Sequence, residues 1–334
     1  MAGLGRKTFS PGDVLTSSDV QGYLMDQSVM VFAGTAARTS AIPSPSAGMV
    51  AYSTATSLQV YNGSAWVDLS TGYGSASGTA ASSTAITVAG TAYTLLTFTT
   101  DSSLVVGRSG LFDVLLVGGG GGGWAPSSYG GGGGGGGVMQ QTIYLSANGT
   151  VTIGSGGTNG IAPTNGGDTS LTSTNIALVG YGGGATNPTL DYGVNGASTG
   201  GTRGSGTTTP LAGLTLQGNR GGAGAGNSTA AGGGGGKGAV GAAGSGTTGG
   251  AGGAGFDVST FIGAGSALFK GAGGGGGGSG TGGAGGSSVG GVGGTSSTNG
   301  GTAAANTGSG GGGAFNAQTS GLGGSGIMYI RFRT

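Results

Sequence analysis

The sequence has no cysteine, no histidine and no glutamate, and charged side chains of either sign are few. Without cysteine the chain can form neither disulfides nor thiolate sites. Without histidine it lacks the usual general base and the commonest metal ligand. A formal net charge of +1 provides no electrostatic footprint for nucleic acid or acidic membranes. We therefore expect no cofactor, no metal site and no nucleic-acid partner.

Long hydrophobic runs are also missing. No segment approaches the roughly 18 apolar residues of a membrane span, so we expect no membrane insertion. The N-terminal stretch MAGLGRKTFSPGDVL has no apolar core typical of a secretion signal. The expectation is a protein that acts where it is made or leaves inside a particle.

Motifs for catalysis are absent as well. The stretch AGGGGGKGAV around Lys237 resembles a phosphate-binding loop, which needs Gly six residues before its Lys and Ser or Thr after it. Ala231 and Gly238 occupy those positions, so the match fails twice. The nine Asp residues are scattered, without the spacing of a calcium loop or a glycosidase pair. We predict that the protein is not an enzyme.

Glycine is what the sequence has in excess, with 93 of 334 residues, roughly four times the usual share of about 7%. Such a composition is typical of disorder, but disordered segments are usually charged and poor in apolar residues. This chain is 6% charged and 35% hydrophobic, which favours an ordered structure.

The first region, residues 1–34, predicts one helix at about residues 17–30. Thr16 followed by Asp19 matches a capping box at its start. Apolar positions then recur at spacings of four, three and four, which gives one apolar face. Since a short helix is unstable alone, this face must pack locally or dock onto a larger assembly, and both remain open. The candidate docking or oligomer residues are Val20, Tyr23, Leu24, Gln27 and Val31.

Two β regions follow. Residues 35–72 predict a small β module with a hairpin at Asn62-Gly63, because such a pair between β-rich runs is a strong turn signal. Trp66 is expected to anchor this module, with a ligand-binding role as the minor alternative. Residues 73–117 predict an antiparallel sheet that acts as a stem.

Residues 118–334 predict a glycine-rich head domain. Glycine runs recur at uneven spacing, with short polar or aromatic segments between them. One interruption predicts a hairpin with Asn148-Gly149 as its turn. The domain closes with a strand at 326–332, in which Ile327, Tyr329 and Arg331 share one face and Met328, Ile330 and Phe332 the other. The predicted fold class is mainly β with one N-terminal helix.

The glycine must allow something that other residues forbid, because ordering each glycine costs roughly 0.5–1 kcal/mol more than ordering alanine. Left-handed extended helices with three residues per turn could pack from every direction without side chains and bond laterally. On that geometry six glycines span about 19 Å and eight about 25 Å. With 7 Pro and no strict triplet the chain is not collagen. Silk-like stacked β and plain linker are the weaker alternatives.

Three parts of the sequence resemble one family. The head GRKTFSPGDVLTSSDVQGYLMDQSVMVFA, with AGMVAYSTATSLQVYNGSAWVDLS after it, resembles the N-terminal region of tailed-bacteriophage minor tail proteins and tail fibres. The segments 112–123 and 323–332 resemble the start and end of the glycine-rich, polyglycine-sandwich domain of phage tail-tip adhesins. The resemblance implies a virion protein on a trimeric fibre, whose distal loops contact the host surface.

The predicted function is therefore a phage tail fibre or minor tail protein located in the virion tail. Its expected partners are other tail proteins, two further copies of itself and a bacterial surface receptor, for which a glycan is a candidate. The alternatives are a structural virion component without a receptor, such as a head fibre, decoration protein or tail spacer, and an ice- or matrix-binding protein. The candidate receptor-binding residues, in aromatic loops between glycine runs, are Trp124, Tyr129, Tyr181, Tyr192, Phe256, Phe261 and Phe269.

Overall fold

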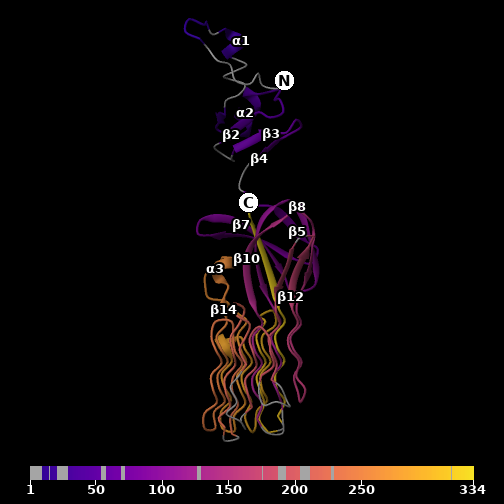
Figure 1. The fold of residues 1–334 in the computed structure, drawn as a ribbon, viewed down its shortest axis with the longest axis vertical. Coiled ribbons are helices and arrows are strands. Elements are labelled where there is room, and N and C mark those ends of the chain that lie inside the picture. The colour runs from indigo at the N-terminus through magenta and orange to yellow at the C-terminus, as the bar shows by residue number, and fades with distance from the viewer. Residues whose placement is uncertain are drawn as a thin grey trace. The chain divides into compact units, whose positions relative to one another are not determined.

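The computed structural model describes residues 10–14, 16–20, 29–53, 58–68, 72–125, 129–174, 176–186, 193–203, 211–226, 229–316 and 318–334. The chain forms two compact units, residues 1–73 and 74–334. Both units are mainly β (Figure 1).

The first unit contains a four-stranded sheet in the order β1-β2-β3-β4 and a helix, α2. Helix α2 contacts β1 and β2, and it buries Arg38 against one face of the sheet. The Arg38 guanidinium lies 4.7 Å from the Trp66 ring and donates a hydrogen bond to Gln59. Trp66 also packs on Tyr61, with ring centroids 5.6 Å apart. The elements are β1 (Met30–Phe32), α2 (Thr35–Ala41), β2 (Val50–Ser53), β3 (Leu58–Tyr61) and β4 (Trp66–Asp68).

The turn between β3 and β4 forms at the predicted Asn-Gly pair. It is longer than the two-residue turn that the pair suggests. Asn62 Oδ1 accepts hydrogen bonds from the backbone N–H groups of Ser64 and Ala65, and only Gly63 of the pair has a positive φ, +102°. The side chain of Asn62 therefore closes the loop in place of a second left-handed residue.

The N-terminal helix begins as predicted but does not have the predicted length. In α1 (Ser17–Asp19), Asp19 N–H donates to Thr16 Oγ1 and Thr16 N–H to Asp19 Oδ2, both at 3.2 Å, which completes the capping box. Val20 is the C-cap residue. The predicted end at Met30 is wrong, because Met30 and Val31 lie in β1. Tyr23, Leu24 and Gln27 lie outside the described residues.

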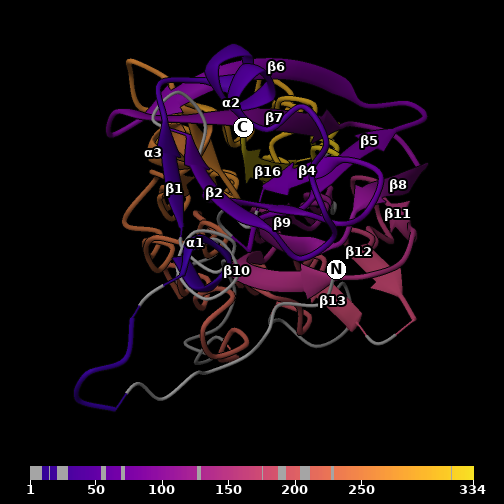
Figure 2. The same ribbon diagram turned by 90° about the horizontal axis from the view of Figure 1, so that it is seen from above.

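The second unit contains two five-stranded sheets. The first sheet has the order β10-β9-β16-β7-β6 and the second has the order β13-β12-β11-β8-β5. Strand β9 contacts β12 and β13 across the two sheets, which lie side by side when seen from above (Figure 2). The strands are β5 (Ser75–Gly78), β6 (Ser82–Val88), β7 (Thr91–Phe98), β8 (Ser102–Arg108), β9 (Gly110–Val117), β10 (Val138–Leu145), β11 (Gly149–Thr152), β12 (Thr169–Ser173), β13 (Ile176–Gly180) and β16 (Ile327–Arg333).

Strand β16 closes the first sheet between β9 and β7. Residues 73–117 therefore do not form a separate stem, because their strands belong to the same two sheets as strands that come after residue 117. The predicted hairpin at Asn148-Gly149 is wrong for a related reason. Strand β10 pairs with β9, whereas β11 pairs with β8 and β12 of the other sheet. Asn148 Oδ1 instead accepts a hydrogen bond from Val106 N–H at 2.9 Å.

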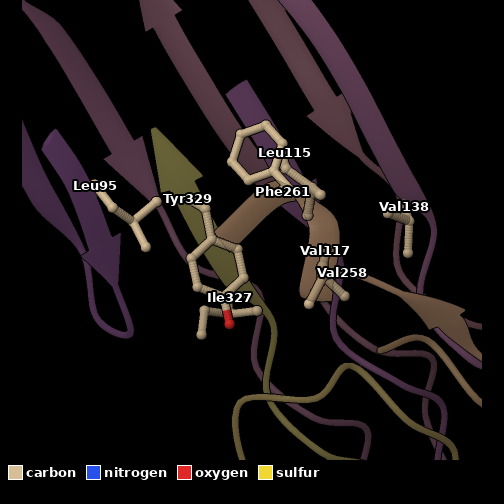
Figure 3. Close-up of a cluster of buried hydrophobic side chains, with 8 residues drawn as sticks. All are labelled: Leu95, Leu115, Val117, Val138, Val258, Phe261, Ile327 and Tyr329. Atoms are coloured by element: carbon tan, nitrogen blue, oxygen red, sulfur yellow. The ribbon is translucent and has the colours of Figure 1, made fainter. Parts of the chain in front are cut away.

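The side chains of the closing strand alternate between two faces, and both faces are buried. On one face, Phe332 meets Phe112 of β9 edge to face, with ring centroids 5.6 Å apart. On the other face, Ile327 and Tyr329 join a buried cluster with Val258 and Phe261 (Figure 3). These last two residues belong to a small subdomain of two strands and one short helix, which the sequence did not predict. Its elements are β14 (Phe256–Asp257), α3 (Ser259–Ile262) and β15 (Phe269–Lys270), and the 3₁₀ turn η2 (Gly286–Ser288) follows later in the chain.

Between the strands run the glycine-rich segments from Gly118 to Gly326, here called the glycine bundle (Figure 1). Consecutive N–H groups of its first run donate to three different neighbouring segments, and residues three apart donate to the same neighbour, at 2.8–3.1 Å. Gly118 and Gly121 donate to the carbonyls of Gly137 and Gly134, respectively. Gly119 and Gly122 donate to those of Gly167 and Thr164, and Gly120 and Gly123 donate to those of Gly324 and Gly321. The carbonyls of Gly119, Gly120 and Gly121 accept from Gly183, Gly157 and Gly311 on three further segments, so this inner segment is bonded to neighbours all around it.

The segments approach too closely for any side chain. A methyl group added to Gly120 would lie 2.0 Å from the carbonyl oxygen of Ser309, and one added to Gly234 would lie 2.0 Å from that of Gly133. Carbon and oxygen atoms that are not bonded need more than 3 Å, so neither position can hold alanine unless the backbone moves. Glycine is required here because the neighbouring backbone fills the space of a side chain.

Candidate functional site

The first glycine hairpin identifies the end of the bundle that lies away from the sheets. Val117 and Val138 pair in the first sheet, and the two glycine runs that leave them bond to each other along their length. The last of these bonds joins Trp124 N–H to the Gly131 carbonyl at 3.3 Å. Trp124 and Tyr129 therefore lie where the hairpin turns, and this end is here called the tip.

Trp124 lies at the tip but is only 4% exposed. Its carbonyl accepts a hydrogen bond from Ala314 N–H at 2.9 Å, and its backbone forms a bridge with Gly160. The Arg203 guanidinium lies 5.5 Å from the centre of its indole ring. Trp124 thus closes the end of the bundle, and little of its ring can contact a partner.

Tyr129 is half-buried and pairs with Phe315, a residue that sequence reasoning missed. The two rings lie 5.4 Å apart at an interplanar angle of 49°, and the backbones form an antiparallel bridge. Phe315 is also half-buried. The signal in the sequence was an aromatic residue close behind a glycine run: Phe315 comes two residues after Gly313, and Trp124 comes directly after Gly123.

A third apolar group at the tip is Ile161, which is 78% exposed. It follows Gly160, whose N–H donates to Ser320 Oγ at 3.0 Å. The Asn159 side chain donates to the Ser320 carbonyl and so holds the same turn. Sequence reasoning missed Ile161 because it stands alone among polar residues. The tip therefore offers aromatic and aliphatic surface on turns fixed by hydrogen bonds.

The other candidate aromatic residues lie elsewhere. Tyr181 directly follows β13 at the sheet end of the bundle and is 44% exposed. Phe256 and Phe269 lie in the paired strands β14 and β15. Phe261 is 2% exposed in the cluster of Figure 3, so its assignment as a contact residue is corrected to a core residue. Tyr192 lies outside the described residues.

Charged groups near the sheet end serve the fold. The Lys270 ammonium donates to the Asn306 carbonyl at 2.7 Å, and burial lowers its pKa. Asp257 accepts hydrogen bonds from the N–H groups of Leu268 and Ser259, and these bonds lower the pKa of its carboxyl group. Both groups hold the subdomain that carries α3.

The described part of the chain contains neither a cluster of metal-binding side chains nor a membrane-spanning helix. There, no three acidic side chains come together in a way that could hold a metal ion. No helix in the same residues has the length and apolar character needed to cross a membrane.

Comparison with known protein families gives a match. The family described as "Glycine-rich domain" matches residues 97–333, which is more than half of the chain. No curated protein matches the sequence. The matched range begins at the end of β7 and ends in β16, so it includes β9, β10 and β16 of the first sheet as well as the glycine bundle. This chain therefore belongs to the glycine-rich domain family.

Proposed function

We propose that this protein is a non-enzymatic component of a tailed-phage virion, a tail fibre or minor tail protein that recognises the host surface. The resemblance of the N-terminal 70 or so residues to phage tail proteins supports the location. Membership of the glycine-rich domain family is compatible with it. Other tail proteins and two further copies of the chain are the proposed virion partners.

We further propose that the glycine bundle consists of polyglycine II helices, which are left-handed, extended and have three residues per turn. The three-residue repeat of hydrogen-bond acceptors supports this geometry, because residues three apart then point the same way. Ordinary β-strands have a repeat of two and bond to two neighbours. A bundle whose segments are hydrogen-bonded to the segments around them would make a rigid support for the turns at its ends.

The observation that carries the receptor proposal is the pair Tyr129 and Phe315 at the tip. Both rings are partly accessible and sit on segments held by backbone hydrogen bonds, so little entropy is lost when they bind. Ile161 adds exposed apolar surface at the same end. Aromatic faces of this kind suit a surface glycan, which is the proposed receptor class.

A purely structural virion role is the second candidate. The burial of Trp124 and Phe261 favours it, since two of the predicted contact aromatics serve packing. In that case Tyr129 and Phe315 would only join the first and last glycine segments.

The two candidates are separated by adsorption of the purified full-length chain to host cells. We expect Tyr129→Ala with Phe315→Ala to weaken adsorption at least about tenfold, as loss of an aromatic hot spot does. Tyr181→Ala, at the opposite end of the bundle, is the matched control and should leave adsorption unchanged. If the unaltered chain adsorbs to no host cell, and antibodies against it leave infection intact, the receptor role is wrong.

A further inference from the structure

Asparagine is followed directly by glycine at six places in the described part of the chain. In such a pair the backbone nitrogen of glycine can attack the side-chain amide carbon of asparagine, because glycine has no side chain in the way. The attack requires an amide group that is free to turn and a glycine N–H that is not held in a hydrogen bond. The six asparagines are Asn62, Asn148, Asn159, Asn165, Asn195 and Asn299.

The pair Asn165-Gly166 is held at both reacting groups. Gly166 N–H donates to the Gly183 carbonyl at 2.9 Å. Asn165 Oδ1 accepts from Ala185 N–H at 2.9 Å, and its Nδ2 donates to the Asn195 carbonyl at 3.0 Å. The reaction would first have to break these bonds within the glycine bundle, so the local structure protects this pair.

Four further pairs are restrained at one reacting group or both. The Asn62 amide is held by the N–H groups of its own turn, as described above. The restraining bonds in the other three pairs are Gly160 N–H to Ser320 Oγ at 3.0 Å, Gly300 N–H to the Thr319 carbonyl at 2.8 Å, and Val106 N–H to Asn148 Oδ1 at 2.9 Å.

The pair Asn195-Gly196 is restrained at neither group. The Asn195 side chain is exposed and Gly196 is half-buried. Among the described residues, neither the Asn195 amide group nor Gly196 N–H takes part in a hydrogen bond. The pair stands at a bend of the chain that covers residues 196–198. The amide of Asn195 can therefore turn toward the Gly196 nitrogen without breaking a bond.

We infer that Asn195 is a site of spontaneous deamidation in the folded protein. The Gly196 nitrogen forms a bond to Asn195 Cγ, the bond from Cγ to Nδ2 breaks, and the proton of Gly196 leaves with the amide nitrogen as ammonia. A water molecule then opens the resulting cyclic imide at one of its two carbonyls. Opening at one carbonyl gives aspartate. Opening at the other gives isoaspartate, in which the backbone runs through the former side chain.

Isoaspartate at this position changes the bundle, because it adds one carbon atom to the backbone between two bonded residues. Val194 N–H donates to the Ala185 carbonyl at 2.7 Å, and Ala197 N–H donates to the Gly182 carbonyl at 2.8 Å. Both acceptors lie on the same neighbouring segment, and a chain lengthened between the two donors cannot keep both bonds undistorted. The modification therefore loosens this segment of the bundle as the protein ages.

Peptide mapping by mass spectrometry tests the inference on the full-length chain after storage in mildly alkaline buffer. Asn165 is the matched control, because it also precedes glycine. We expect Asn195 to deamidate at least about tenfold faster than Asn165 in the folded protein, since the Asn165 pair must first open locally. In urea, where neither pair is restrained, the two rates should be similar. Equal rates in the folded protein, or an Asn195 that reacts only in urea, overturn the inference.

Amide hydrogen exchange tests the consequence for the bundle. Ala197 N–H should exchange at least about tenfold faster in the aged chain than in the fresh chain. Asn195→Gln is the control, because the longer side chain closes such a ring far more slowly, and its exchange should not change with age. Asn195→Asp carries the new charge without the added backbone carbon and should exchange more slowly than the aged chain. An aged chain that contains isoaspartate but exchanges like the fresh one contradicts the loosening.

Discussion

The two five-stranded sheets of the second unit, here called the sandwich, and the glycine bundle share one continuous chain but are packed in opposite ways. In the sandwich, side chains such as Phe112, Leu116 and Ile330 fill the space between backbones and are fully buried. In the bundle, the backbones themselves fill the space, and an added methyl group at Gly234 would meet a carbonyl oxygen at 2.0 Å. The stabilising contacts are apolar in the first region and hydrogen-bonded in the second.

This difference predicts different tolerance of substitution. A side-chain core can rearrange around a lost methylene group, because neighbouring rotamers adjust. A backbone core has no rotamers that can move aside, and an inner segment such as Gly118–Gly123 is bonded to neighbours all around it. A small substitution should therefore destabilise the bundle more than it destabilises the sandwich.

The largest effect is expected for Gly234→Ala in the bundle. The clash with the Gly133 carbonyl should cost at least about 3–4 kcal/mol of the free energy of unfolding, above the range usual for overpacked side-chain cores. Gly265→Ala is the control, because nothing lies within 4 Å of a methyl group there. That change should stay within about 0.5 kcal/mol of the original or be slightly stabilising. Urea unfolding measures both, and equal stability of the two variants would contradict the account of the bundle.

The next effect concerns Arg331, whose side chain forms an ion pair within the first sheet and also holds α3. Arg331 Nε lies 3.1 Å from Asp113 Oδ2, both side chains are 13% exposed, and Arg331 also donates to the Phe261 carbonyl. Arg331→Met should cost about 3 kcal/mol, because the Asp113 carboxylate loses its countercharge in a mostly buried place. Adding Asp113→Asn should recover part of this loss. A cost below about 1 kcal/mol would contradict this prediction, because it is the cost expected for a solvent-exposed ion pair.

The smallest effect is a loss of stability at alkaline pH caused by Tyr329. Burial raises the pKa of this phenol to about 12 from its usual 10, so between these values it is ionised mainly in the unfolded chain. Its contribution is complete below pH 10 and falls by about 1.4 kcal/mol per pH unit as pH rises toward 12. Tyr329→Phe should make the unfolding free energy less dependent on pH in this window. Tyr144→Phe, at a 59% exposed position, is the matched control.

The sequence predicted best the parts of the fold that depend on neighbours in the chain. The capping box at Thr16 and Asp19 and the alternation of the closing strand are both local patterns. The β10–β11 hairpin was predicted wrongly because Asn148-Gly149 is also used where the chain crosses between sheets. An isolated turn signal does not show which strands pair across it.

The candidate site was harder to predict from the sequence. In the sequence, Trp124, Tyr129 and Phe261 all lie in aromatic loops between glycine runs and look alike. In the structure, Trp124 and Tyr129 lie at the tip and Phe261 does not, and Trp124 and Phe261 are buried. Phe315 meets Tyr129 only through the return of the last glycine segment, after 186 residues. Contacts between distant segments depend on the order in which the glycine runs pack, and identical glycines carry no signal of that order.

Amide hydrogen exchange tests the central claim, that the backbone of the glycine runs is the core of the bundle, most directly. The N–H groups of Gly118–Gly123 are all bonded to neighbouring segments, as those of a central strand are. The account predicts that they exchange as slowly as the amides of β9 and β16, within about a factor of ten. Exchange at the rate of an unstructured chain, with β9 and β16 still protected, would contradict it.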